Sequence, residues 1–279
     1  MYLTRHASDK GPGWALNGQC LEPGVTLAAL LAMPSNEMVA CLRQTANGKP
    51  ATGPLLAPIE PTQEVWAAGV TYLRSREARL IESDTKDIYD KVYDAERVEL
   101  FFKAIGWRAK GHGESVRIRA DSHWNVPEPE LTLVINRENR IVGYCAGNDV
   151  SSRDIEGANP LYLPQAKIYN GACALGPGIV IADADDLTDL SIRMDIVRNG
   201  RTVFSGQTQT SKMKRPFIEL VDWLGRELDF PQGVFLMTGT GIVPPDAFTL
   251  ERGDTILADP HEVEPPPRHP VPARDLVHQ

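Results

Sequence analysis

The run Pro127-Glu128-Pro129-Glu130, followed by Leu-Thr-Leu-Val-Ile, constrains the fold of this chain more than any other segment. Successive side chains of a strand point to opposite faces, so Glu128 and Glu130 share one face and Leu131 and Leu133 share the other. Two glutamates on one face can converge on a single ion. The prolines remove backbone donors, so this segment is expected at a sheet edge or at the start of a strand.

A third carboxylate follows on the returning chain. The polar residues from Asn136 to Asn139 predict a turn, and the segment from Arg140 to Gly147 predicts a second strand that brings Asp149 back to the glutamates. Three carboxylates in one place repel each other unless a cation lies between them. The pattern therefore predicts a cage for a hard metal ion. The alternative is an exposed edge strand whose charges guard against aggregation.

Four motifs in this order resemble the fumarylacetoacetate hydrolase superfamily: the Glu-x-Glu strand, the segment Gly147-Asn148-Asp149-Val150-Ser151-Ser152-Arg153-Asp154, Lys167, and Thr238-Gly239-Thr240-Gly241. The resemblance extends over roughly residues 65–259. It implies an α+β, mainly β fold of the mixed β-sandwich roll type. It also implies that Glu128, Glu130 and Asp149 bind magnesium, manganese or calcium.

The composition is that of an ordinary, mildly acidic globular protein. The 279 residues are 42% hydrophobic and 24% charged, with a net charge of -8, which favours one main domain and a small second module. Nucleic acid is not expected as a partner, because no Lys/Arg cluster is present. No transmembrane segment or secretory signal is recognisable, so we expect a cytosolic protein without membrane contact. The four cysteines form no Cys-x-x-Cys pair and are expected to be reduced.

The organisation along the chain can be outlined from local patterns. Residues 1–62 are rich in Gly, Pro and small side chains, which predicts a small, mainly β N-terminal domain ahead of a catalytic domain at 63–279. Further expected elements are a buried strand at 65–71, one or two amphipathic helices at 73–102, a hairpin around Asn199-Gly200 and a helix at 215–224. The tail after Glu264 is expected to be irregular or a docked arm.

The chain departs from the hydrolytic members of the family at one important place. In the smaller hydrolases a Gly-x-Asn-Tyr strand end is followed by a histidine and a glutamate that activate water. Here Ser75 stands where that histidine would fall, so water activation is in doubt. Glu156 stands where larger hydrolases carry glutamine, and a carboxylate there can act as an acid or a base. With the run Asn159-Pro160-Leu161-Tyr162-Leu163-Pro164-Gln165-Ala166-Lys167, these features resemble the 2-keto-3-deoxy sugar acid dehydratases.

That resemblance implies removal of water from a 2-keto-3-deoxypentonate to give 2-oxoglutarate semialdehyde. The metal would bind the carboxylate and keto oxygens of the substrate and stabilise the enolate. Lys167 or Glu156 would take the C3 proton, and Glu156 or a water on the metal would assist loss of the C4 hydroxyl. Expected substrate-binding residues are Tyr72, Arg74, Ser75, Lys103, Arg153, Gln165 and Thr240.

Two other functions are compatible with the sequence. One is hydrolysis of a carbon-carbon bond in an acylpyruvate or related diketo acid, with Glu77 or His123 replacing the missing dyad. The other is binding of metal or a sugar acid without turnover. The resemblance further implies a homodimer.

Overall fold

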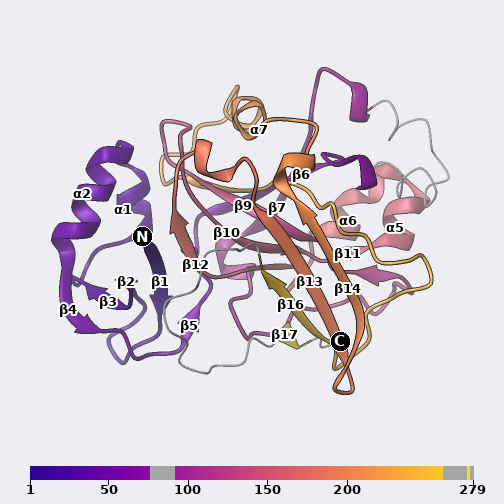
Figure 1. Cartoon of the computed structure of the whole chain (residues 1–279), viewed down its shortest axis with the longest axis horizontal. Coiled ribbons are helices and arrows are strands. Elements are labelled where there is room, and N and C mark those ends of the chain that lie inside the picture. Colours follow the sequence, from indigo (N-terminus) through magenta and orange to yellow (C-terminus); the bar gives the residue numbers. More distant parts are fainter. Residues whose placement is uncertain (76–91, 260–274, 277–279) are drawn as a thin grey trace.

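The structure, a computed structural model, describes residues 1–75, 92–259 and 275–276. Its framework is a large sheet that runs through the whole molecule (Figure 1). Within the described residues the strand order of this sheet is β4-β3-β2-β1-β12-β10-β9-β15-β6-β7, with β5 paired to β1. Its strands are β1 (Tyr2–His6), β2 (Gly13–Leu16), β3 (Gln19–Leu21), β4 (Ala46–Pro50), β5 (Leu55–Leu56), β6 (Glu64–Gly69), β7 (Glu99–Ile105), β9 (Pro129–Ile135), β10 (Ile141–Asp149), β12 (Cys173–Ile181) and β15 (Val234–Met237). The expectation of a mainly β, α+β fold is confirmed.

Two smaller sheets complete the described β-structure. One has the order β14-β13-β16-β17, and the other pairs β11 with β8. The predicted hairpin at Asn199-Gly200 joins β13 to β14, and both turn residues have positive φ, at 51° and 75°, as a two-residue hairpin turn requires. The bounds are β8 (Asn125–Val126), β11 (Ser151–Ser152), β13 (Ser191–Arg198), β14 (Arg201–Gln209), β16 (Thr255–Asp259) and β17 (Asp275–Leu276).

The helices are short and lie around the sheets. Helices α1 and α2 lie at one end of the molecule and α5 and α6 at the other (Figure 1). The predicted helix after Arg215 is α7, which follows Pro216 and buries Phe217, Leu220, Val221 and Leu224 on one stripe. The helical elements are α1 (Leu27–Leu31), α2 (Ser35–Thr45), η1 (Gly106–Arg108), α5 (Arg153–Ala158), η2 (Pro160–Tyr162), α6 (Leu163–Lys167), η3 (Asp185–Leu187), η4 (Thr210–Lys212) and α7 (Phe217–Leu224).

The β9–β10 hairpin lies inside the large sheet, between β15 and β12. Every residue of β9 is buried, so the alternative of an exposed edge strand is wrong. Pro129 is the first residue of β9, where its missing N–H costs no ladder hydrogen bond. Leu131, Leu133 and Ile135 pack in one hydrophobic cluster and Val134 in another, as the alternation predicts.

The N-terminal region differs from its prediction in two respects. It contains the helices α1 and α2, which were not predicted. Strand β1 also pairs with β12, with Tyr2 opposite Val180, so residues 1–62 share the large sheet with the rest of the chain. The domain boundary at residue 62 stays a prediction.

The predicted helices at 73–102 are only partly found. Residues 73–75 and 92–94 are helical, and residues 76–91 lie outside the described residues. From Glu99 the chain is the strand β7, which pairs with β6, so the helix prediction is wrong at 99–102. No helix in the described parts of the chain is long and apolar enough to cross a membrane.

Candidate active site

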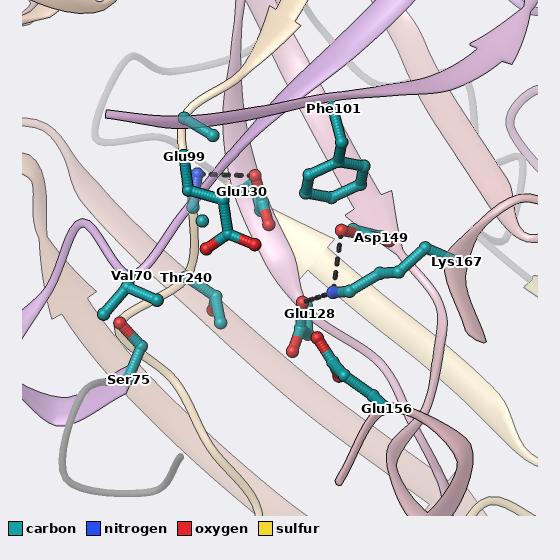
Figure 2. A pocket seen from close by; sticks show the side chains of 13 residues that line it. Val70, Ser75, Glu99, Phe101, Glu128, Glu130, Asp149, Glu156, Lys167 and Thr240 are labelled. Atoms are coloured by element: carbon teal, nitrogen blue, oxygen red, sulfur yellow. Dashed lines mark hydrogen bonds and ion pairs between the residues drawn. The ribbon is translucent and has the colours of Figure 1, made fainter. Parts of the chain in front are cut away.

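A pocket opens where the ends of β6, β7, β9 and β10 meet α5, α6 and the loop after β15 (Figure 2). The space outside its atoms is about 370 Å³, which includes the open mouth of the pocket. Among the described residues, the carboxylates that line it are Glu99, Glu128, Glu130, Asp149 and Glu156.

Glu128, Glu130 and Asp149 form the carboxylate cage. One oxygen from each lies within 4.8 Å of the others, and all three side chains are buried. The β9–β10 pairing produces this arrangement, since Glu130 is opposite Gly147 and the Asp149 amide donates to the Glu128 carbonyl at 2.9 Å. A Cβ atom at Gly147 would lie 2.2 Å from Thr132 Oγ1, so the close approach beside the cage requires glycine.

Lys167 bridges two members of the cage. Its Nζ donates to Glu128 Oε2 at 2.5 Å, to Asp149 Oδ2 at 3.0 Å and to Ser151 Oγ at 2.7 Å. The residue is the last of α6 and is buried, and its side chain also lies beside the ring of Phe101. A cationic nitrogen is thereby fixed at the wall of the pocket, next to the carboxylates (Figure 2).

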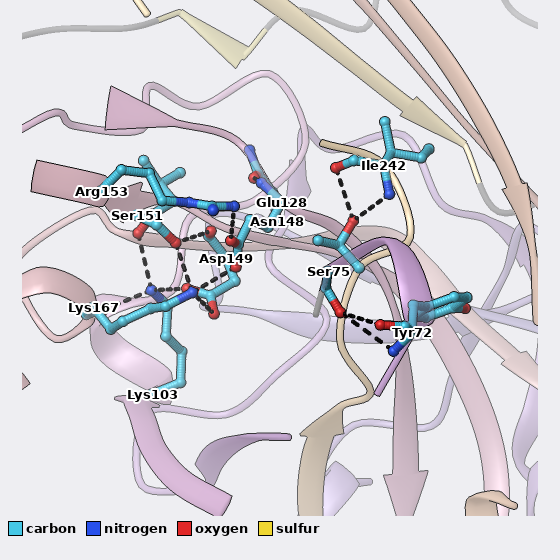
Figure 3. A network of polar contacts seen from close by, with 12 residues as sticks. Tyr72, Ser75, Lys103, Glu128, Asn148, Asp149, Ser151, Arg153, Lys167 and Ile242 are labelled. Atoms are coloured by element: carbon cyan, nitrogen blue, oxygen red, sulfur yellow. Dashed lines mark hydrogen bonds and ion pairs between the residues drawn. The ribbon is translucent and has the colours of Figure 1, made fainter. Parts of the chain in front are cut away.

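Lys103 supports the cage from behind. Its Nζ forms an ion pair with Asp149 Oδ1 and donates to the carbonyls of Lys167, at 2.6 Å, and Val150, at 3.2 Å (Figure 3). The side chain is fully buried and is not among the described residues that line the pocket. We predicted from the sequence that Lys103 binds substrate. In the structure it lies behind Asp149, away from the pocket, and links Asp149 to the backbone carbonyl of Lys167.

Arg153 holds Glu128, the glutamate that Lys167 also contacts. Its Nη2 donates to Glu128 Oε1 at 2.6 Å, so Glu128 accepts from a cation on each of its two oxygens. The Arg153 amide donates to the Trp124 carbonyl at 2.7 Å, which fixes the start of α5. Arg153 is buried and contacts the cage, but it does not line the pocket.

Glu130 has a different environment from the other two carboxylates. Its Oε2 accepts the Gly239 amide at 2.6 Å. Burial raises the pKa of Glu130 well above the ordinary value, and the charges of Asp149 and Glu128 raise it further. Gly239 has a φ of 89°, and a Cβ there would lie 2.1 Å from Thr71 Oγ1, so the donor loop also requires glycine.

The cage brings three carboxylates together in a buried place. Among the described residues, Lys103, Arg153 and Lys167 form ion pairs with Glu128 and Asp149. The pKa of Glu130 is raised first by its burial and then by these two neighbouring carboxylates. Carboxylate oxygens are the donors that Mg²⁺ and Ca²⁺ prefer. The residues present therefore fit a hard divalent cation.

The other predicted site residues fall into two groups. Ser75, Glu156 and Thr240 line the pocket. Tyr72 is buried, and its amide and carbonyl both hydrogen-bond the Ser75 hydroxyl, at 3.3 Å and 2.8 Å. Arg74 and Gln165 are exposed and do not line it.

Glu99 lines the pocket but was not among the site residues predicted from the sequence. It begins β7, and the same strand carries Phe101 and Lys103 towards the site. Residues at i, i+2 and i+4 of a strand share a face, so this alternation was the signal that could have found Glu99. The incorrect helix prediction for this segment concealed it.

Of the two groups considered for a hydrolytic dyad, the described residues include His123. His123 is exposed, does not line the pocket, and its amide donates to Asp154 Oδ2 at 2.7 Å. Glu77 lies outside the described residues.

The chain is similar to several known proteins over most of its length. The family model "Fumarylacetoacetate (FAA) hydrolase C-terminal" matches residues 65–262. The chain is 48% identical over 195 residues to a probable 2-keto-3-deoxyxylonate dehydratase of Haloferax volcanii, covering 70% of this chain and 67% of that protein. It is 48% identical over 192 residues to the 2-dehydro-3-deoxy-D-arabinonate dehydratase of Saccharolobus solfataricus, covering 67% of this chain and 64% of that protein. The matched segments thus span about two thirds of each relative.

Solved structures of dehydratases superpose on nearly the whole chain. A 2-keto-3-deoxyarabinonate dehydratase superposes with a TM-score of 0.80 and 36% identity, covering 93% of this chain and 94% of that one. A 2-keto-3-deoxy-D-arabinonate dehydratase complexed with magnesium and 2,5-dioxopentanoate superposes with a TM-score of 0.74 and 34% identity, again covering 93% and 94%.

Proposed function

Since the chain belongs to the fumarylacetoacetate hydrolase family, we propose that it is a metal-dependent dehydratase that converts a 2-keto-3-deoxypentonate to 2,5-dioxopentanoate, which is 2-oxoglutarate semialdehyde. The observation that carries this proposal is a buried carboxylate cage bridged by Lys167 in the same pocket as two further carboxylates, Glu99 and Glu156. The relatives named as 2-keto-3-deoxypentonate dehydratases, and the neighbour complexed with magnesium and 2,5-dioxopentanoate, support it.

Glu128, Glu130 and Asp149 would hold the metal ion, with Mg²⁺ as the first choice and Mn²⁺ or Ca²⁺ as alternatives. When bound, the ion supplies Lewis-acid polarisation of the keto group, which makes the C3 protons more acidic. Lys103 and Arg153 keep the cage in shape, because each contacts one of its carboxylates from outside the pocket.

The reaction requires protons to be moved at several atoms of the substrate. Loss of a C3 proton and the C4 hydroxyl, which leaves as water, gives a C3–C4 double bond. One C5 proton must then leave and C3 must regain one, after which the enol at C4–C5 becomes the aldehyde. The net change is the loss of one water molecule without oxidation.

The pocket offers three groups for these transfers. Lys167 lies on the cage and is assigned to the C3 proton. Glu156 lies near Lys167 in Figure 2 and is assigned to protonate the departing hydroxyl. Glu99 comes from a different strand and is assigned to the C5 proton. Positioned acids and bases of this kind contribute about 10²- to 10⁴-fold each.

Product analysis of magnesium-loaded and EDTA-treated protein tests the proposal. A 2-keto-3-deoxypentonate and an acylpyruvate are supplied in parallel, and the products are identified by NMR. Metal-dependent formation of 2,5-dioxopentanoate is expected. Release of pyruvate and a free acid from the acylpyruvate would identify a hydrolase instead, and tight binding of both compounds without turnover would identify a binding protein.

We also propose that the chain forms a homodimer, as the family resemblance implies, and that it is located in the cytosol. Light scattering of the purified chain tests the dimer, for which a monomeric mass is the contrary result.

A further inference from the structure

Val70 has a backbone conformation that is rare for its residue type. Its φ is 52°, and the other non-glycine residues with positive φ in the described chain are Asn17, Asn139 and Asn199. Asparagine tolerates this region because its short polar side chain can hydrogen-bond locally, whereas a β-branched side chain there is strained. Such strain persists where the surrounding structure enforces it, and it is concentrated at functional sites.

Hydrogen bonds hold the chain directly after Val70. Thr71 Oγ1 donates to the Thr238 carbonyl at 2.6 Å, and the Thr71 carbonyl accepts the Lys214 amide at 3.0 Å. Strand β6 ends at Gly69, directly before Val70.

The turn puts the Val70 side chain into the wall of the pocket. Val70 is 9% exposed and lines the pocket beside Ser75. In Figure 2 these two residues lie on the side away from Lys167 and Asp149, with Thr240 between the two sides. The Ser75 hydroxyl is engaged with the Tyr72 backbone, and Val70 contributes an apolar side chain to this wall.

We propose that Val70 determines substrate specificity by closing the pocket to 2-oxo acids longer than five carbons. This inference rests on the proposed function, because the cage at the other side anchors the carboxylate and keto oxygens of the substrate. Because Val70 lines the same pocket as the cage, the distal carbon of a five-carbon acid anchored there would be the one to meet the valine side chain. A methylene too many or too few in an apolar pocket changes selectivity about 10- to 200-fold.

Binding of unreactive straight-chain 2-oxo acids tests the wall separately from catalysis. Pyruvate, 2-oxopentanoate, 2-oxohexanoate and 2-oxoheptanoate are titrated by calorimetry into magnesium-loaded protein. For the natural chain we expect affinity to fall at least about tenfold on going from five to six carbons. Equal affinity for the five-, six- and seven-carbon acids would overturn the proposal.

Two substitutions at Val70 should change this length profile in opposite directions. Val70→Ala enlarges the pocket and should raise the affinity for the six-carbon acid relative to the five-carbon acid by about tenfold. Val70→Ile fills the pocket further and should weaken binding of 2-oxopentanoate while leaving pyruvate binding unchanged. If one variant is too unstable to be titrated, the other variant provides the test. A folded variant whose affinities depend on chain length as in the natural protein would overturn the proposal.

Asn199→Gly is the matched control for a backbone effect. Asn199 also has positive φ, at 51°, but lies in the β13–β14 hairpin. The Asn199→Gly variant should therefore bind 2-oxo acids with the same dependence on chain length as the natural protein. Dehydration of a 2-keto-3-deoxypentonate is measured alongside. Absence of turnover together with the expected length profile would refute the proposed function alone, whereas turnover with no effect at Val70 would refute the specificity assignment alone.

Discussion

Replacing Glu130 with glutamine isolates the charge of one cage member. The Glu130 oxygen lies within 4.8 Å of oxygens from Glu128 and Asp149. Glutamine has the same length, and its amide oxygen can still accept the Gly239 N–H that now donates to Glu130 at 2.6 Å. The variant therefore removes a negative charge and retains the hydrogen bond.

The expected change in the free energy of unfolding follows from Coulomb's law. Two unit charges 4.8 Å apart repel by about 3.5 kcal/mol at an effective dielectric constant of about 20. Glu130 faces two such neighbours, and the Lys167 ammonium, which contacts both of them, offsets roughly one repulsion. About 3 kcal/mol then remains, and we expect metal-free Glu130→Gln to be more stable than the natural chain by up to this amount at alkaline pH.

The pH dependence has a definite sign. The pKa of Glu130 is raised in the folded protein, mainly by burial and then by Asp149 and Glu128. A raised folded pKa stabilises the fold below the unfolded value of about 4.3, and this contribution is lost as pH rises through the folded value. The advantage of the glutamine variant should therefore be absent at about pH 4 and should grow towards alkaline pH.

Magnesium should reverse the order of stability of the two proteins, so that the natural chain becomes more stable than Glu130→Gln. A ligand present at about 100 times its Kd stabilises a protein by about 2.7 kcal/mol, and the natural chain should gain on this scale while Glu130→Gln gains little. Urea unfolding is measured between about pH 4 and pH 9 with EDTA or with excess magnesium, using the exposed Glu227→Gln as control. A metal-free variant less stable than the natural chain at high pH, or an undiminished magnesium response, would refute the reasoning.

Three further substitutions test other parts of the site. Lys103→Met should lower the free energy of unfolding by about 3–5 kcal/mol, since it removes the buried cation paired with Asp149; urea unfolding measures this, and a loss below about 1 kcal/mol would mean that the ion pair is immaterial. Lys167→Met should lower kcat by about 10²- to 10⁴-fold in a dehydration assay, and near-normal turnover would remove Lys167 from the chemistry. Glu99→Gln should lower kcat but leave the magnesium-induced rise in Tm unchanged, because Glu99 is not part of the cage; an altered rise would make it a metal ligand.

The cage was accessible from the sequence because short-range rules position it. The strand period puts Glu128 and Glu130 on one face, and a four-residue turn returns Asp149 to them. The buried position of β9 was not accessible in this way. The neighbour β10 follows β9 across a short turn, but the neighbour on the other side is β15, which comes from residues 234–237.

The features that were not predicted correctly also have specific structural causes. Helix α2 buries only Met38 and Leu42, so its apolar stripe is too short to stand out in the sequence. Lys103 was expected at the substrate, but three acceptors hold its ammonium behind Asp149. Sequence spacing gives the face of a strand and not the depth at which a long side chain ends.

The position of β15 has a consequence for how the chain reaches its native state. This strand is inserted between β9 and β6, parallel to β6 and antiparallel to β9. During synthesis, β6 and β9 must wait without their common partner until residues 234–237 have left the ribosome. Unpaired hydrophobic edges of this kind invite intermolecular pairing, and contacts so distant in sequence form slowly. We therefore expect C-terminal truncations before Val234 to aggregate rather than to persist as folded fragments, and a low growth temperature or chaperone supply to favour the yield of the full chain.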